Sequence, residues 1–325
     1  MPPASESHVP VMAETALELM RIRPDGVYVD ATSGAGGHGA RIAAKLRGGR
    51  LISLDRDQEA VTMSAARLAP YSCATVVKAN YSDLDEVLRD AGIAALDGVL
   101  FDLGVSSMQL DTASRGFSFQ ADGPLDMRMD NSAPTDAQAW LAGASREEIY
   151  SALRDYGDVG PAGRIADKIR ARVACGQMTR TSDLAAAVTE ALDFVSGTPV
   201  EVRTVFQAIR MAVNEELKHL DAGLRQAGAK LAPTGRIVAI TFHSGEDRVV
   251  KQLFRAWTRP EVRLAPDGRV KEKRAPTMKL ATRKPVLPTA DEIERNPRSK
   301  SAKVRAVERI LFAAAKGQED INAAY

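Results

Sequence analysis

Residues 27–46 read VYVDATSGAGGHGARIAAKL, and this stretch indicates the fold class. Its first four residues form an apolar run that ends at Asp30, and a turn rich in glycine follows. From His38 onward the apolar residues recur at helical spacing. A short buried strand, a glycine turn and a helix in this order are typical of an α/β fold.

The same alternation continues to about residue 110. We expect further strands at 50–55, 75–78 and 96–102, and further helices at 60–68 and 84–90. Strands that alternate with helices in this way predict a doubly wound, Rossmann-like parallel sheet of the α/β class. Ligands bind such sheets beyond the carboxyl ends of the strands, which is where Asp30, Asp55 and Asp102 fall.

The strand pattern stops after this region, and residues 136–231 have helical spacing. Ser145 and Glu148 form the pattern of a capping box at the start of an amphipathic segment. Strand character returns at 235–242. We therefore predict a discontinuous α/β domain, residues 1–112 and 226–325, with an all-helical insertion at 113–225.

Composition sets limits on the function. The chain has 325 residues, with 45% hydrophobic and 26% charged residues and a formal net charge of +2, as is usual for a globular protein. Residues 259–309 nevertheless hold 15 Lys and Arg against 7 Asp and Glu, a local excess of +8. This basic segment predicts a polyanionic partner, and a solvated basic tail or linker explains it equally well.

The two cysteines, Cys73 and Cys175, lie far apart and have no CxxC spacing. The N-terminal sequence has no basic region followed by an apolar stretch, and no apolar run approaches the ~20 residues that span a bilayer. We expect a cytoplasmic protein with no membrane partner.

Residues 34–39 match the pattern GxGxxG, so an NAD-dependent oxidoreductase is one alternative. In a dinucleotide site the glycines follow the strand at once, because the helix N-terminus receives a pyrophosphate. Here Asp30 ends the strand, and three residues separate it from Gly34. A carboxylate at that place favours a ligand with an ammonium and a sulfonium. Asp55 suits two ribose hydroxyls in either fold family, and a cap or turn role is the alternative for both aspartates.

Five longer motifs are more specific. They are DLGVSSMQL at 102–110, GFSF at 116–119, DGPLDMRM at 122–129, FQAIR with VNEEL at 206–217, and FHSGEDR at 242–248. From about His8 to Arg309 the chain closely resembles the family of ribosomal RNA small-subunit methyltransferase H, the 16S rRNA cytosine-N4 methyltransferases. Gly245 stands where that family usually has leucine.

The resemblance implies a methyltransferase domain with a helical insertion that recognises RNA. It also implies S-adenosyl-L-methionine as the cofactor and methylation of a cytosine N4 amine in the decoding region of 16S rRNA, within the small ribosomal subunit. Carried over by matching motif, the cofactor contacts are Gly36, Gly37, His38, Asp55, Tyr81, Asp102 and Gln109. Tyr81 would lie against the adenine; alternatively, it is an ordinary aromatic residue at the end of a strand.

The N4 lone pair of cytosine is delocalised into the ring, and methyl transfer requires the nitrogen to lose a proton. Acceptors beside the amine favour that change. We expect Asp102 to be both cofactor contact and amine acceptor, with Ser106 or Ser107 assisting; alternatively, Asp102 holds only the cofactor and the proton goes to water. Methylation at carbon 5 is disfavoured, because neither cysteine lies in an active-site motif.

We expect no metal, because the four histidines show no ligand spacing. An extruded base would give access to the amine. Candidate RNA contacts, with intramolecular ion pairs as the alternative for each, are Arg115, Arg128, Arg203, Arg210, Arg248 and Lys251. A non-enzymatic RNA-binding assembly factor is the third function considered. The sequence identifies no protein partner and is compatible with a homodimer.

Overall fold

The computed structural model describes residues 10–192, 197–264, 266 and 269–311. The chain divides into two compact units. The sheet unit comprises the chain up to Asp55, Val61–Leu103 and the chain from Asp221 onward. The helical unit comprises Gly104–Leu220 together with the short segment Arg56–Ala60.

The sheet unit is built on seven strands in the order β3-β2-β1-β4-β5-β9-β8. Their bounds are β1 Val27–Asp30, β2 Arg50–Asp55, β3 Ala74–Lys78, β4 Leu96–Asp102, β5 Leu231–Thr241, β8 Met278–Leu280 and β9 Lys303–Arg309. The first five strands pair in parallel, β9 pairs antiparallel with β5, and β8 pairs antiparallel with β9. The predicted α/β fold with a doubly wound sheet is confirmed.

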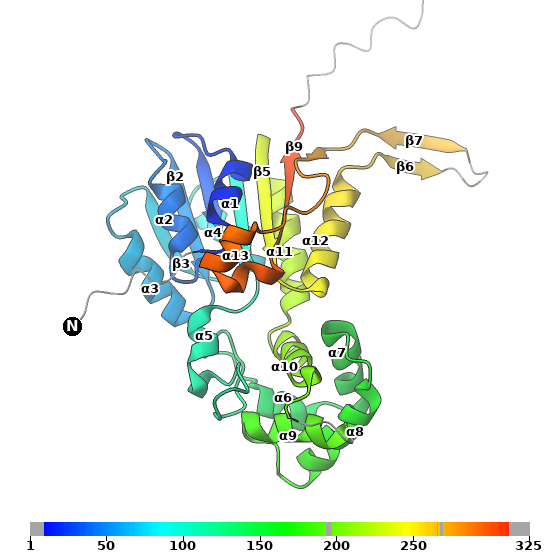
Figure 1. The fold of residues 1–325 in the computed structure, drawn as a ribbon. Coiled ribbons are helices and arrows are strands. Elements are labelled where there is room, and N and C mark those ends of the chain that lie inside the picture. The colour runs from blue at the N-terminus through cyan, green and yellow to red at the C-terminus, as the bar shows by residue number, and fades with distance from the viewer. Residues whose placement is uncertain (1–9, 193–196, 265, 267–268, 312–325) are drawn as a thin grey trace, which may run out of the picture. The chain divides into compact units, whose positions relative to one another are not determined.

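Helices cover both faces of this sheet (Figure 1). They are α1 Ala13–Met20, α2 Gly37–Ala43, α3 Gln58–Leu68, η1 Tyr81–Asp83, α4 Leu84–Asp90, α11 Glu216–Lys230, α12 Ser244–Trp257, α13 Ala290–Arg295 and η3 Pro297–Ser301. The core between sheet and helices holds Tyr28, Ile42, Leu100 and Val238, all at most 1% exposed. Because both faces of the central strands are buried, those strands are continuous apolar runs in the sequence.

The proline- and charge-rich segment after α12 is more regular than expected. Strands β6, Glu261–Leu264, and β7, Val270–Arg274, pair as an antiparallel hairpin, and β8, Met278–Leu280, forms an edge strand of the seven-stranded sheet. Arg274, the last residue of β7, pairs with Glu261 of β6. The last strand, β9, ends at Arg309. His8, where the family resemblance begins, lies outside the described residues.

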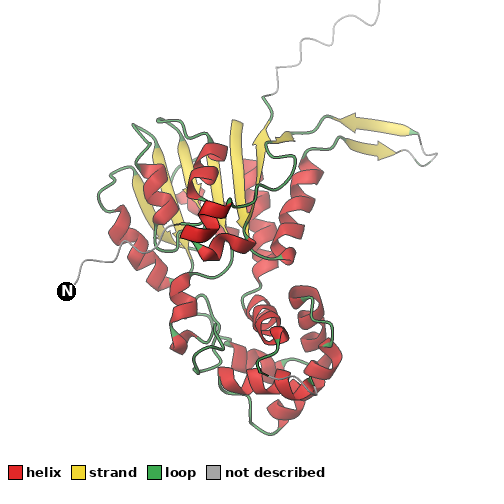
Figure 2. Cartoon of the chain, viewed as in Figure 1, coloured by secondary structure: helices red, strands yellow, loops and turns green. Residues whose placement is uncertain are grey.

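The helical unit packs around its own apolar core, and its regular elements among the described residues are helices (Figure 2). They are α5 Ser107–Asp111, η2 Ala113–Arg115, α6 Ala137–Gly143, α7 Arg146–Gly157, α8 Ala162–Ala174, α9 Thr181–Ala191 and α10 Val200–Val213. The predicted capping box of α7 is present, since Ser145 and Glu148 bond each other's backbone. The main segment of this unit is Gly104–Leu220, and the domain boundaries at 113 and 225 stay a prediction.

Across the part of the chain that the structure describes, every helix falls short of the length and apolar character that crossing a membrane requires.

Candidate functional site

The glycine turn between β1 and α2 brings backbone close to the carboxyl ends of the strands. Gly34 and Gly36 have φ angles of +51° and +76°, a region that glycine occupies without strain. A side chain at Gly39 would place Cβ 2.9 Å from Ser53 Oγ and 3.3 Å from Asp30 Oδ2. These glycines therefore allow α2 to press directly onto the ends of β1 and β2.

Three carboxylates stand at the ends of neighbouring parallel strands, as predicted. Asp30 pairs with Ser53 of β2 and Leu100 of β4, so Asp55 and Asp102 each lie two residues beyond it along their strands. The backbone N–H of Gly34 donates to Asp55 Oδ2 over 2.8 Å. The N–H of Asp102 donates to the hydroxyl of Thr32 over 2.6 Å, a contact that the sequence did not suggest.

His38 is buried among these carboxylates. Its Nε2 lies 3.2 Å from Asp102 Oδ2, and its side chain is 4% exposed. Burial lowers the pKa of His38, but the contact with Asp102 and the charges of Asp102 and Asp30 outweigh it and raise the pKa above its usual value. The predicted site residues His38 and Asp102 are thus in direct contact.

Asp30 is fully buried and poorly satisfied. Its Oδ1 accepts a long hydrogen bond of 3.4 Å from the N–H of Thr32. Its Oδ2, like Asp102 Oδ1, accepts no hydrogen bond from any residue that the structure describes. Burial raises the pKa of Asp30 to about 6, although the nearby His38 opposes this shift.

The carboxylates of Asp30, Asp55 and Asp102 fit a cationic ligand. Buried carboxylate oxygens without donors are costly, and a ligand with positive charge and N–H groups would relieve that cost. The three carboxylates at these strand ends would instead repel a diphosphate. Asp30 and Asp102 would face the ammonium and sulfonium of S-adenosylmethionine, and Asp55 its ribose hydroxyls.

Replacing Asp55 with alanine is expected to weaken S-adenosylmethionine binding by about 1–3 kcal/mol, the range for hydrogen-bonding groups left unpaired. The ribose hydroxyls and the N–H of Gly34 would both lose their acceptor. Isothermal titration calorimetry measures the change, and the control is Asp90→Ala, which replaces an exposed carboxylate at the last residue of α4. Unchanged affinity in folded Asp55→Ala protein would remove Asp55 from the site.

Tyr81 opens the short helix η1 after β3. Its ring meets Phe101 of β4 edge-on, with centroids 5.7 Å apart and planes at 74°. Gly223 of α11 packs so closely that a Cβ there would lie 2.8 Å from Tyr81 Cδ2. The ring is therefore held in one orientation from two sides, and its stacking against an adenine stays a prediction.

Gln109 and Ser106 belong to the helical unit, where both cap α5. Ser106 Oγ accepts from the N–H of Gln109, and Gln109 Oε1 accepts from the N–H of Ser106. The amide nitrogen of Gln109 donates to Asp57 Oδ2 over 2.8 Å. The cofactor role of Gln109 and the catalytic roles of Ser106 and Ser107 remain predictions, but Ser106 and Gln109 have these structural partners.

Asp57 and Arg115 form the polar centre of the helical unit. Arg115 donates to Asp57 over 2.8 Å and to Glu59 over 3.1 Å, and both Arg115 and Asp57 are at most 5% exposed. Arg115 also donates to the carbonyls of Arg128 and Met129. Sequence reasoning missed this network, because its two charged partners lie 58 residues apart.

Three of the predicted RNA contacts have carboxylate partners inside the helical unit. Arg128 donates to Asp126 over 2.7 Å, and Arg210 donates to Glu216, also over 2.7 Å. Arg115, Arg128 and Arg210 therefore form intramolecular ion pairs, which was the alternative to an RNA contact for each of them. Arg203 is exposed on α10.

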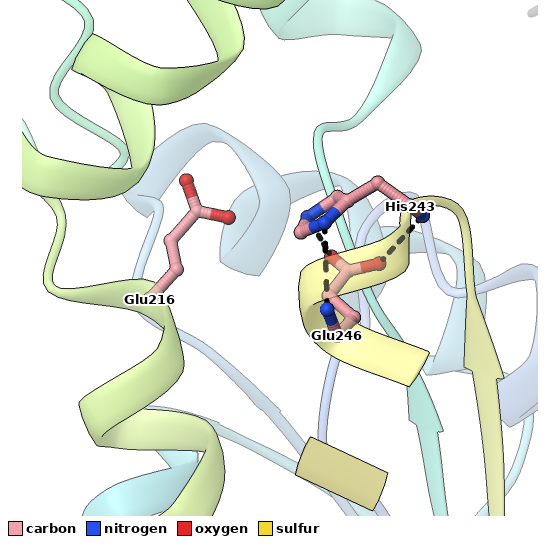
Figure 3. Close-up of side chains that lie close together, drawn as sticks. All are labelled: Glu216, His243 and Glu246. Carbon is pink, nitrogen blue, oxygen red and sulfur yellow. Dashed lines mark hydrogen bonds and ion pairs between the residues drawn. The ribbon is translucent and has the colours of Figure 1, made fainter. Parts of the chain in front are cut away.

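The motif at 242–248 forms the start of α12, at the carboxyl end of β5. His243 Nδ1 accepts from the N–H of Glu246, whose Oε2 accepts from the N–H of His243 (Figure 3). Glu246 Oε2 also accepts from the N–H of Phe242. Glu246 is 2% exposed. The motif is thus a capping box in which histidine replaces the usual serine or threonine.

Comparisons with known proteins agree with this geometry. A model of the MraW methylase family matches residues 5–310. The chain belongs to this family. It is 42% identical over 309 residues to Ribosomal RNA small subunit methyltransferase H of Carboxydothermus hydrogenoformans, covering 94% of this chain and 99% of that relative. The protein of the same name from Nitrosococcus oceani is also 42% identical, with 94% and 98% covered.

A solved rRNA methylase from Streptococcus thermophilus is 10% identical, covers 92% of this chain and 94% of its own, and has a TM-score of 0.39. That likeness is too distant to support an inference about function. The family match confirms the resemblance predicted from the five motifs, and with it the methyltransferase class and S-adenosylmethionine as methyl donor.

Proposed function

We propose that this MraW-family methylase transfers a methyl group from S-adenosylmethionine to the N4 amine of a cytosine in the decoding region of 16S ribosomal RNA. Ribosomal RNA as substrate is supported by the names of the relatives. The choice of an amine nitrogen is supported by one structural observation. The carboxylate of Asp102, which is 22% exposed, stands at the end of β4, and its buried Oδ1 is unpaired among the described residues.

An amine acceptor must lose a proton as it gains the methyl group. The acceptor nitrogen attacks the methyl carbon in line, so it needs a hydrogen-bond acceptor for its N–H. Asp102 offers a free oxygen for that bond, and Thr32 fixes the backbone of Asp102. The oxidoreductase alternative is disfavoured, because the carboxylates around the glycine turn would repel a pyrophosphate.

In this proposal the helical unit recognises RNA, and the substrate is the small subunit rather than free RNA. The exposed Arg203 and the basic segment 259–309 are the proposed phosphate contacts. Two cations of that segment are paired within the sheet unit, since Arg305 donates to Asp247 and Lys279 contacts Glu308. A ribosomal substrate places the enzyme in the cytoplasm, and a homodimer fits the proposal.

Mass spectrometry of 16S rRNA tests the target. Cells without this protein are expected to lack one N4-methyl group on a decoding-region cytosine, and the purified protein should restore it on small subunits from those cells. A non-enzymatic assembly factor would restore nothing in the purified reaction. A methyl group found at carbon 5, or on another nucleotide, would contradict the proposal.

A further inference from the structure

Cofactor binding alone does not explain why the imidazole of His38 is buried beside Asp102. This ring lies inside the sheet unit, with Nε2 3.2 Å from Asp102 Oδ2, and it is 4% exposed. Neither ring nitrogen makes a hydrogen bond with another described residue, and Nε2 is at ion-pair distance from Asp102. A buried imidazole that contacts one carboxylate and lies within the electrostatic influence of a second, Asp30, can carry a proton.

Charged groups on β1, β4 and α2 act on the imidazole of His38. Asp102 of β4 and Asp30 of β1 both favour the protonated ring. Arg41, one turn further along α2, opposes it, and Glu14 of α1 pairs with Arg41. Asp55 of β2 interacts electrostatically with Asp30. Burial lowers the pKa of His38, but Asp102 and Asp30 outweigh burial and Arg41, so this pKa is raised.

Charge balance in methyl transfer gives this ring a role. The bond between the methyl carbon and sulfur breaks with its electron pair left on sulfur, so the cofactor loses one positive charge. The nitrogen lone pair forms the new bond to carbon, and the amine releases one proton. The positive charge lost at sulfur therefore reappears as a proton that needs an acceptor in the same site.

We propose that His38 is the positioning residue that stores this proton, receiving it through Asp102 from the methylated nitrogen. This inference rests on the proposed amine acceptor. The cofactor's positive charge disfavours a second cation beside Asp102, so His38 is neutral when the cofactor is bound. Once sulfur is neutral, the carboxylates again favour the imidazolium, and Asp102 can pass the proton from the nitrogen to His38 Nε2.

The proposal makes a prediction that needs no RNA. Binding of S-adenosylmethionine should expel a proton from His38, whereas S-adenosylhomocysteine, whose sulfur is uncharged, should expel none. Calorimetric titrations near neutral pH in buffers of different ionisation enthalpy measure this release for each ligand. Subtracting the proton release measured with S-adenosylhomocysteine from that measured with S-adenosylmethionine removes any contribution from the amino group that both ligands carry.

Two variants identify the source of the proton. His38→Gln should abolish the extra release while the variant still binds S-adenosylhomocysteine. Asp30→Asn should keep the release and shift its maximum to lower pH, because one carboxylate that raises the pKa of His38 is gone. If Asp30→Asn abolished the release and His38→Gln did not, Asp30 would be the group that titrates, and the proposal would be wrong.

Nuclear magnetic resonance of wild-type protein labelled on its four histidines gives an independent readout should His38→Gln fail to fold. The pKa of His38 is expected to fall by about one unit or more with S-adenosylmethionine, the size of shift that a nearby charge produces. With S-adenosylhomocysteine it should stay high. Equal values with both ligands would overturn the proposal, while rRNA mapping separately tests the methyl acceptor.

Discussion

A methionine in place of Arg115 is expected to lower the free energy of unfolding of the helical unit by about 3–5 kcal/mol, the range for breaking one side of a buried ion pair. Asp57, 1% exposed, would keep its charge and lose its guanidinium partner. The carbonyls of Arg128 and Met129 would lose their donor as well. Methionine is similar in length to arginine, so the fall in the free energy of unfolding reports the lost charge and hydrogen bonds more than a new cavity.

Urea denaturation followed by fluorescence measures this loss. Trp140 lies in the helical unit and Trp257 in the sheet unit, so a Trp257→Phe background isolates the signal of Trp140. Arg180→Met is the matched control, because Arg180 pairs with Asp122 at an exposed position of the same unit. It should cost no more than about 1 kcal/mol. An equal effect of the two substitutions would contradict a structural role for the buried network.

The same network extends to residues adjacent to the cofactor turn. Asp57 and Glu59 belong to the helical unit, yet Asp57 follows Asp55 by only two residues. Arg115 therefore fixes the segment that leaves the end of β2.

Local sequence signals predicted the parts of the fold that local forces determine. The strand ends at Asp30, Asp55 and Asp102 follow from apolar runs that stop at a charged residue, and the Ser145 capping box follows from spacing. These features depend on residues within a few positions of one another. They place the candidate site at the carboxyl ends of the parallel strands.

Contacts between distant residues could not be predicted in this way. The bond from Asp102 N–H to Thr32 joins residues 70 positions apart, and His38 meets Asp102 across a similar span. Pairing of β6 with β7 was missed, because charged residues and a nearby proline obscure the alternation of a strand. A single sequence contains no signal for such pairings until the fold brings them together.

Replacing Asp102 with asparagine is expected to lower kcat for methylation of small subunits by about 100- to 10,000-fold, the range for loss of a general base. The carboxamide keeps the size of the side chain and the backbone bond to Thr32. It cannot take the proton that the acceptor nitrogen releases, nor pass one to His38. Single-turnover methylation with saturating S-adenosylmethionine measures the chemical step.

Asp97→Asn is the control for this change, because Asp97 lies on the same strand at its opposite end and accepts from the N–H of Val27. Its kcat should stay at the wild-type value. If Asp102→Asn kept its kcat and lost only cofactor affinity, Asp102 would merely hold the cofactor, and the proton would leave to water. A fall in kcat at unchanged cofactor affinity identifies Asp102 as the acceptor, because only the transition state then loses an interaction.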